Sequence, residues 1–144
     1  MFLSILVVFF TISFMSPAGS HGQTPTNEYY ELQKKCAKQS EEWFRGKYTL
    51  GIKATHEGKT FNYYHYHHNM KLNKCFMIIG DVFLPDHGNR IVSKKNLFVI
   101  NENKEYGAFA KVIQETNPIS CYLGDKSCKT EKEWNLLVKP LMEE

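Results

Sequence analysis

Residues 75–84 read CFMIIGDVFL and form the most apolar stretch outside the N-terminal segment. Aliphatic, β-branched and aromatic side chains in a run of this length are typical of a buried central strand. Residues 85–89 (PDHGN) follow, and we expect a turn there because proline presets φ and glycine accepts positive φ. We therefore predict a central strand over Cys75–Leu84, with a possible β-bulge at Gly80–Asp81.

Shorter strand patterns flank this central strand on both sides. The connections between them are short and rich in turn-forming residues, which favours antiparallel neighbours. One of these strands carries a possible interruption at residues 94–96. The flanking strands are expected over Tyr48–Thr55, Phe61–Met70, Arg90–Ile100 and Tyr106–Ile113.

A helix is expected at each end of this strand region. Tyr29, Leu32, Cys36 and Trp43 recur at helical spacing, with Thr26 or Asn27 as the N-cap and Gly46 as the stop. The second helix follows residues 130–133 (TEKE), which have the form of a capping box. Pro140 should kink or end this helix near Lys139.

These elements predict an α+β fold. It comprises an N-terminal helix, a four- to five-stranded mostly antiparallel sheet, and a short C-terminal helix, with both helices packed on one face of a meander-like sheet.

The N-terminal segment has the pattern of a signal peptide. Residues 2–15 are apolar and uncharged, and residues 16–20 (SPAGS) supply small residues for cleavage before His21 or Gln23. The apolar run is shorter than the roughly 20 residues that a bilayer-spanning helix needs. No lysine or arginine precedes it, and an uncleaved interfacial anchor is the alternative. We expect residues 1–22 to be a signal peptide and residues 23–144 to form one domain, with no membrane span after cleavage.

All four cysteines follow this segment: Cys36, Cys75, Cys121 and Cys128. An even number in a small exported domain predicts two disulfides, with three possible connectivities. A tight turn at Gly124–Asp125 would make Cys121 and Cys128 cross-strand partners and leave Cys36 to pair with Cys75. The spacings do not match a zinc knuckle. These features predict a periplasmic or secreted protein.

The balance of basic and acidic side chains does not indicate a particular class of partner. The chain of 144 residues has 18 basic and 15 acidic side chains, for a formal charge of +3. This near balance predicts no nucleic-acid partner.

Three histidines lie within four positions in the segment 65–68 (HYHH). On a strand, His65 and His67 project to one face, while Tyr64, Tyr66 and His68 project to the other. His65 and His67 are therefore candidate ligands for Zn²⁺ or Cu²⁺, with further ligands from His56, His87, Asp81 or Asp86. The alternatives are an aromatic-rich strand that fills the sheet, and a tyrosine-rich surface for a ligand or partner.

The sequence lacks G-x-S-x-G, H-E-x-x-H and P-loop motifs. No catalytic residue is predicted, and we expect the protein not to be an enzyme. A hydrolase or a hydrolase inhibitor is an alternative, and the inhibitor would present the turn at residues 85–89. Asn69 and Asn73 are expected to make structural hydrogen bonds where a turn enters the central strand.

Several segments resemble a family of short, exported, uncharacterised bacterial proteins. The most specific is residues 67–76 (HHNMKLNKCF), which is similar to the family form H-Y-N-x-K-L-N-K-C-F. His68 departs from this form, so only His67 of the candidate metal ligands falls on it. The other positions that carry the resemblance are 32–36 (LQKKC), 41–44 (EEWF), Cys121, 128–134 (CKTEKEW) and 137–144 (LVKPLMEE). The resemblance implies a bacterial, exported origin.

The sequence thus predicts a small exported domain that binds an envelope or extracellular macromolecule without catalysis. A metal-binding protein that uses the histidine-rich strand is the first alternative.

Overall fold

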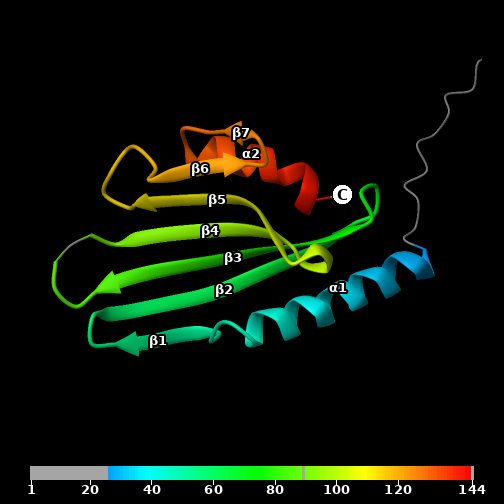
Figure 1. The fold of residues 1–144 in the computed structure, drawn as a ribbon, viewed down its shortest axis with the longest axis horizontal. Helices are drawn as coiled ribbons and strands as arrows, with labels where there is room; N and C mark the ends of the chain where they lie inside the picture. The colour runs from blue at the N-terminus through cyan, green and yellow to red at the C-terminus, as the bar shows by residue number, and fades with distance from the viewer. Residues whose placement is uncertain (1–25, 89, 144) are drawn as a thin grey trace, which may run out of the picture.

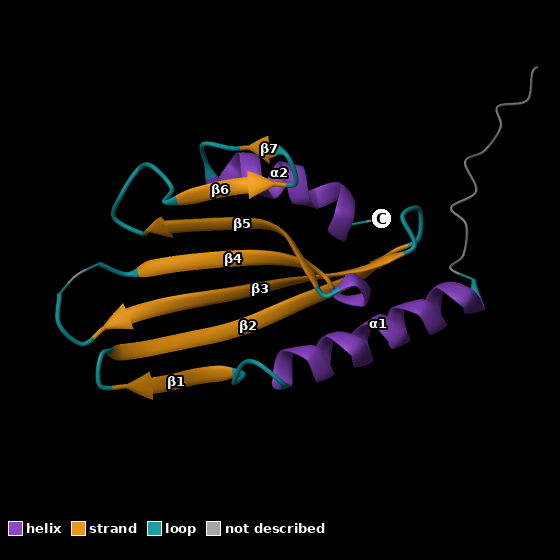
Figure 2. Cartoon of the chain, in the orientation of Figure 1, coloured by secondary structure: helices purple, strands orange, loops and turns teal. Residues whose placement is uncertain are grey.

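Among the described residues, 26–88 and 90–143, seven strands form one antiparallel sheet in which each strand pairs with the next along the chain (Figure 1). The predicted signal segment, residues 1–22, lies outside the residues that this computed structural model describes. Figure 2 shows one helix at each end of the chain. The elements are α1 (Asn27–Arg45), β1 (Gly51–Thr55), β2 (Gly58–Asn69), β3 (Lys74–Pro85), β4 (Val92–Val99), β5 (Lys104–Val112), β6 (Ser120–Leu123), β7 (Lys126–Ser127) and α2 (Glu131–Met142), with a 3-10 turn at Ile100–Glu102.

The first half of strand β3, residues 75–79, is covered on both of its faces. Cys75, Met77 and Ile79 belong to the apolar cluster that contains Cys36 and Phe44 of α1. The alternate residues Phe76 and Ile78 pack in the cluster that contains Trp134 and Val138 of α2. A strand covered on both sides reads as a continuous apolar run because neither set of alternating side chains faces water.

The two helices therefore lie on opposite faces of the sheet, and the expectation that both pack on one face was wrong. We call these faces the α1 face and the α2 face. The physical reason lies in residues 75–79, where every position is apolar and each face needs its own cover.

The sheet also has more strands than the four to five expected. The cysteine hairpin, β6 and β7, continues the sheet because Gly107–Ala110 of β5 pairs with Ser120–Leu123 of β6. The predicted interruption of β4 at residues 94–96 is absent, since those residues pair with both neighbouring strands.

Gly80 is not part of a bulge. The register runs unbroken through it, opposite Tyr63 on β2 and Lys95 on β4. A Cβ at Gly80 would lie 2.0 Å from the Cζ atom of Tyr63, so the glycine provides space for the tyrosine ring. The register shift instead occurs between Leu97 and Phe98, where β4 pairs with β5.

Both helix starts agree with the predicted caps. The hydroxyl of Thr26 accepts a hydrogen bond from the Tyr29 N–H, and that of Thr130 accepts one from the Glu133 N–H at 3.1 Å. Pro140, however, does not end α2, which continues to Met142. A proline this close to the end removes only one intrahelical hydrogen bond.

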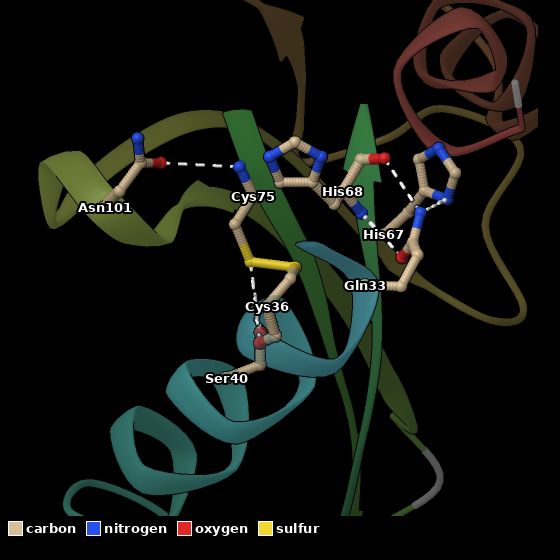
Figure 3. The surroundings of a disulfide bond; sticks show 7 residues. All are labelled: Gln33, Cys36, Ser40, His67, His68, Cys75 and Asn101. Atoms are coloured by element: carbon tan, nitrogen blue, oxygen red, sulfur yellow. Dashed lines mark hydrogen bonds between the residues drawn. A yellow bond between two sulfur atoms is a disulfide. The ribbon is translucent and has the colours of Figure 1, made fainter. Parts of the chain in front are cut away.

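Both predicted disulfides are present. Cys36–Cys75 joins α1 to β3 with a Cα–Cα distance of 5.4 Å, and Cys121–Cys128 closes the β6–β7 hairpin at 5.0 Å (Figure 3 shows the first). The hairpin turns at Gly124, whose φ is +59°, as the position of Gly124–Asp125 indicated.

Two disulfides indicate an oxidising, extracytoplasmic compartment. No helix among residues 26–88 and 90–143 has the length and apolarity to cross a membrane.

A second link between α1 and the sheet was not predicted. The Gln33 side chain accepts a hydrogen bond from the His68 N–H at 3.0 Å and donates one to the His68 carbonyl at 2.9 Å (Figure 3). Strand β1 pairs with β2 only as far as Asn62. The amide of Gln33 thus takes the place of a neighbouring strand at His68 and satisfies its backbone groups.

Removing each disulfide tests their relative contributions to stability. C36A/C75A should lower the free energy of unfolding by about 4 kcal/mol, and C121A/C128A by about 2.5 kcal/mol, because the first bridge closes the longer loop. Urea denaturation at pH 7 measures both values. A larger loss for the hairpin bridge, or a Cys36–Cys121 peptide in a non-reducing digest, would contradict this assignment.

Asn69 is 1% exposed and joins the β2–β3 turn to α2. Its side chain donates to the Pro140 carbonyl at 3.0 Å and accepts from the Leu72 N–H at 2.9 Å, as predicted for Asn69. The same expectation for Asn73 was wrong: its backbone N–H donates to the Met70 carbonyl at 3.3 Å, and its side chain makes no hydrogen bond within the described residues. Asn69→Ala should cost about 2 kcal/mol of stability because it removes two hydrogen bonds that join the β2–β3 turn to α2. The control is Asn73→Gly: Asn73 has a φ of +49°, which glycine adopts freely, so stability should change little. Equal losses in both variants would refute this role for Asn69.

Candidate functional site

Part of the α2 face is not covered by α2. The register places Ile52, Phe61 and Val82 side by side across β1, β2 and β3, on the same face as Phe76 and Ile78. Tyr63 and Leu84 share this face. Ile52 is 70% exposed, and Phe61 and Leu84 are each 43% exposed. We call these five residues the open face, and exposed apolar side chains gathered in this way mark interaction surfaces.

The size of α2 explains why the open face exists. Its 12 residues give a helix about 18 Å long, whereas the 12 residues of β3 extend about 40 Å. The hydrogen bond from Asn69 to Pro140 holds α2 over the end of the sheet near the β2–β3 turn. The open face lies toward the other end, where Gly58 pairs with Pro85.

A groove of about 450 Å³ lies between the open face and α2. Tyr63, His65 and Lys95 line it from the sheet, and Trp134 and Val138 line it from the helix. The indole Nε1 of Trp134 is buried and has no hydrogen-bond acceptor within the described part of the chain. The groove therefore combines apolar walls with several polar groups.

The charged side chains on the strands of the α2 face are of one sign, whereas helix α2 and its C-cap add Glu131 and Glu143. Lys59, Lys95 and Lys111 project from its strands, and none of the strand positions on this face over residues 52–65, 76–84, 93–97 and 109–111 is acidic. Lys95 donates to Glu131 of α2 at 2.6 Å. Within the described residues, Lys59 and Lys111 have no carboxylate at ion-pair distance. A partner with acidic groups would complement this surface.

The candidate metal ligands are only partly brought together. His65 pairs with Ile78 and His67 with Phe76, so both project to the α2 face, as predicted. His56 lies in the β1–β2 turn and His87 in the β3–β4 turn, at the other end of the sheet. Seven residues of strand between Gly58 and His65 correspond to about 24 Å.

Asp81 projects to the α1 face, opposite His65, and Asp86 lies beyond Pro85 in the distant turn. No group of three or more potential metal ligands occurs among residues 26–88 and 90–143. The Zn²⁺ or Cu²⁺ site at His65 and His67 stays a prediction. Titration of the protein and of a variant with both histidines changed to alanine tests it.

A small polar pocket lies beside the Cys36–Cys75 disulfide. It measures about 190 Å³ and is lined by Lys35, Gln39, His68 and Asn101, among others. His68 is 6% exposed, and its Nδ1 atom has no hydrogen-bond partner within the described residues. The Asn101 side chain accepts from the Cys75 N–H at 3.4 Å (Figure 3). This hydrogen bond joins the 3-10 turn to β3, and the sequence did not indicate it.

Two titratable groups on the α1 face are perturbed by burial. Burial raises the pKa of Asp81 above its ordinary value of 3.8, and Lys94 acts in the opposite direction. Burial likewise raises the pKa of Tyr48, with smaller contributions from Asp81 and Glu105. The charged forms of both side chains are therefore disfavoured in the folded protein.

Asp81→Asn tests this electrostatic assignment. Because the folded state holds the Asp81 proton more tightly than the unfolded state, the contribution of Asp81 to the wild-type free energy of unfolding should fall as the pH rises above 3.8. The asparagine variant lacks this loss, so its stability relative to the wild type should be greater at pH 7 than at pH 3. Chemical denaturation at both pH values measures the difference, and the opposite trend would contradict the assignment.

Comparison with known proteins identifies no relative: no family model, no curated protein and no solved structure matches the chain. The resemblance to exported bacterial proteins and the inhibitor alternative stay predictions. In the turn proposed for an inhibitor, residues 86–88 are exposed and follow Pro85, while Asn89 lies outside the described residues.

The open face was missed by the sequence analysis. Ile52, Phe61 and Leu84 each stand in an ordinary strand pattern, and such a pattern does not say which face a helix leaves uncovered. The sequence did contain one signal: the C-terminal helix is much shorter than the central strands, so it cannot cover the whole of one face of the sheet.

Proposed function

We propose that this protein is a non-enzymatic binding protein of the bacterial envelope or extracellular space, and that it holds a protein partner on its open face. The observation that carries the proposal is the exposure of Ile52, Phe61 and Leu84 beside one another on a rigid sheet. Burying such side chains contributes roughly 25 cal/mol per Å² of apolar surface, which favours association. The two disulfides support an extracytoplasmic site of action.

The shape of the molecule favours a protein over a lipid bilayer. Helix α2 packs on the same face as the open face, and a helix layer stands about 10 Å above a sheet. A planar membrane would meet α2 before it reached Phe61. A second copy of this chain is also disfavoured, because face-to-face packing would bring together two surfaces that both carry lysines without an ion-pair partner in the described residues, Lys59 and Lys111.

Affinity capture from extracts of the source cells tests the proposal. The wild type should retain a protein that can be identified by mass, purified and shown to bind directly. Ile52→Ser/Phe61→Ser should weaken this binding at least tenfold, or by about 1.4 kcal/mol, because two central apolar contacts are lost.

The matched control is Leu136→Ser. Leu136 is 60% exposed on α2 but is not part of the open face, so its change should leave the affinity unaltered. Binding that is lost with Leu136→Ser and kept in the double variant would overturn the proposal. Turnover of a substrate that disappears when one polar residue is changed would also overturn it.

A further inference from the structure

Helix α2 itself shows how this sheet accepts a helix. It contacts β6 and β2, so it crosses the strands rather than following them. Trp134 packs near Phe109 of β5, with ring centroids 6.3 Å apart, and Pro140 reaches Asn69 of β2. The acidic first turn of α2 lies over β4, where Glu131 pairs with Lys95.

The open face repeats this arrangement beside α2. Lys111 on β5 is basic, as Lys95 on β4 is. The apolar residues follow in the same direction across the sheet, from Leu84 on β3 to Phe61 on β2 and Ile52 on β1. A helix parallel to α2 would therefore meet lysine first and apolar side chains afterwards.

The dimensions also suit a helix. From β5 to β1 there are four strand spacings, or about 19 Å, which corresponds to about 13 helical residues. This length is close to the 12 residues of α2. Acidic residues in the first turn of such a helix would be favoured by its own dipole as well as by Lys111.

We propose, on the basis of the proposed function, that the open face binds an amphipathic helix of the partner protein beside α2. The acidic first turn of this helix lies over Lys111, and its apolar side chains pack on Ile52, Phe61 and Leu84. The bound helix completes the helical layer that α2 begins on this face.

Two synthetic peptides of 14 residues, acetylated and amidated at their ends, test this proposal against the full chain. Both carry the same stripe of leucine and isoleucine, but one has glutamate in the first turn and the other has lysine there. Isothermal titration should show at least tenfold tighter binding of the glutamate peptide at 50 mM salt. The difference should shrink at 500 mM salt, where screening is stronger. Methyl NMR should show the largest shifts at Ile52 and Leu84.

Lys111→Glu should remove the preference for the glutamate peptide. The control is Lys53→Glu, which changes an exposed lysine on the α1 face of β1 and should leave the preference intact. Neither lysine lies in the core, so both variants should fold.

Equal binding of the two peptides at the open face would overturn the acidic-helix inference and leave the proposed function standing. Binding of neither peptide, together with binding to phosphatidylglycerol vesicles that Ile52→Ser/Phe61→Ser abolishes, would overturn both. Binding that is lost with Leu136→Ser and kept in Ile52→Ser/Phe61→Ser in the capture experiment would overturn the proposed function, and this inference with it.

Discussion

The burial of residues 75–79 of β3 on both faces of the sheet is the constraint on which the rest of the structure depends. Cys75, Met77 and Ile79 need cover on the α1 face, and Phe76 and Ile78 need it on the α2 face. One helix cannot satisfy both, so the chain places one before the sheet and one after it. Each helix is then fixed by a specific link near the β2–β3 turn: the Cys36–Cys75 disulfide for α1, and the hydrogen bond from Asn69 to Pro140 for α2. Loss of either link weakens the attachment of one helix to the same strand region.

The same constraint leaves apolar surface uncovered. Both links hold the helices near one end of a sheet whose central strands are about 40 Å long. Covering the remainder of the α2 face would require a second crossing helix, which the described residues do not supply. Exposed side chains such as Ile52 and Phe61 weaken the solubility of a free protein, and their retention on a disulfide-linked scaffold is consistent with a surface that a partner covers. The lysines on this face that have no ion-pair partner in the described part of the chain, Lys59 and Lys111, make the surface basic, which would favour a partner with acidic groups.

Local features were predictable from sequence, and features that depend on distant segments were not. The helix caps at Thr26 and Thr130 and the disulfide of the β6–β7 hairpin depend on interactions within a few residues, so the sequence predicts them. The Cys36–Cys75 disulfide was predicted from the two cysteines that remained once Cys121 and Cys128 were paired. The side on which α2 packs was predicted wrongly, because an unbroken apolar run does not distinguish one buried face from two. Gly80 suggested a bulge, but the space it leaves is filled by Tyr63, 17 positions earlier in the chain. The two hydrogen bonds between the Gln33 side chain and the His68 backbone likewise depend on which elements become neighbours in space, and so does the open face.

The most direct test of the account is the solvent accessibility of the open face in the complex. Paramagnetic relaxation by a soluble gadolinium chelate can be measured at the methyl groups of Ile52, Leu84 and Leu136, before and after addition of the purified partner. The account predicts strong relaxation at all three in the free protein, and protection of Ile52 and Leu84 but not of Leu136 in the complex. A complex in which Ile52 and Leu84 stay as accessible as in the free protein would contradict it.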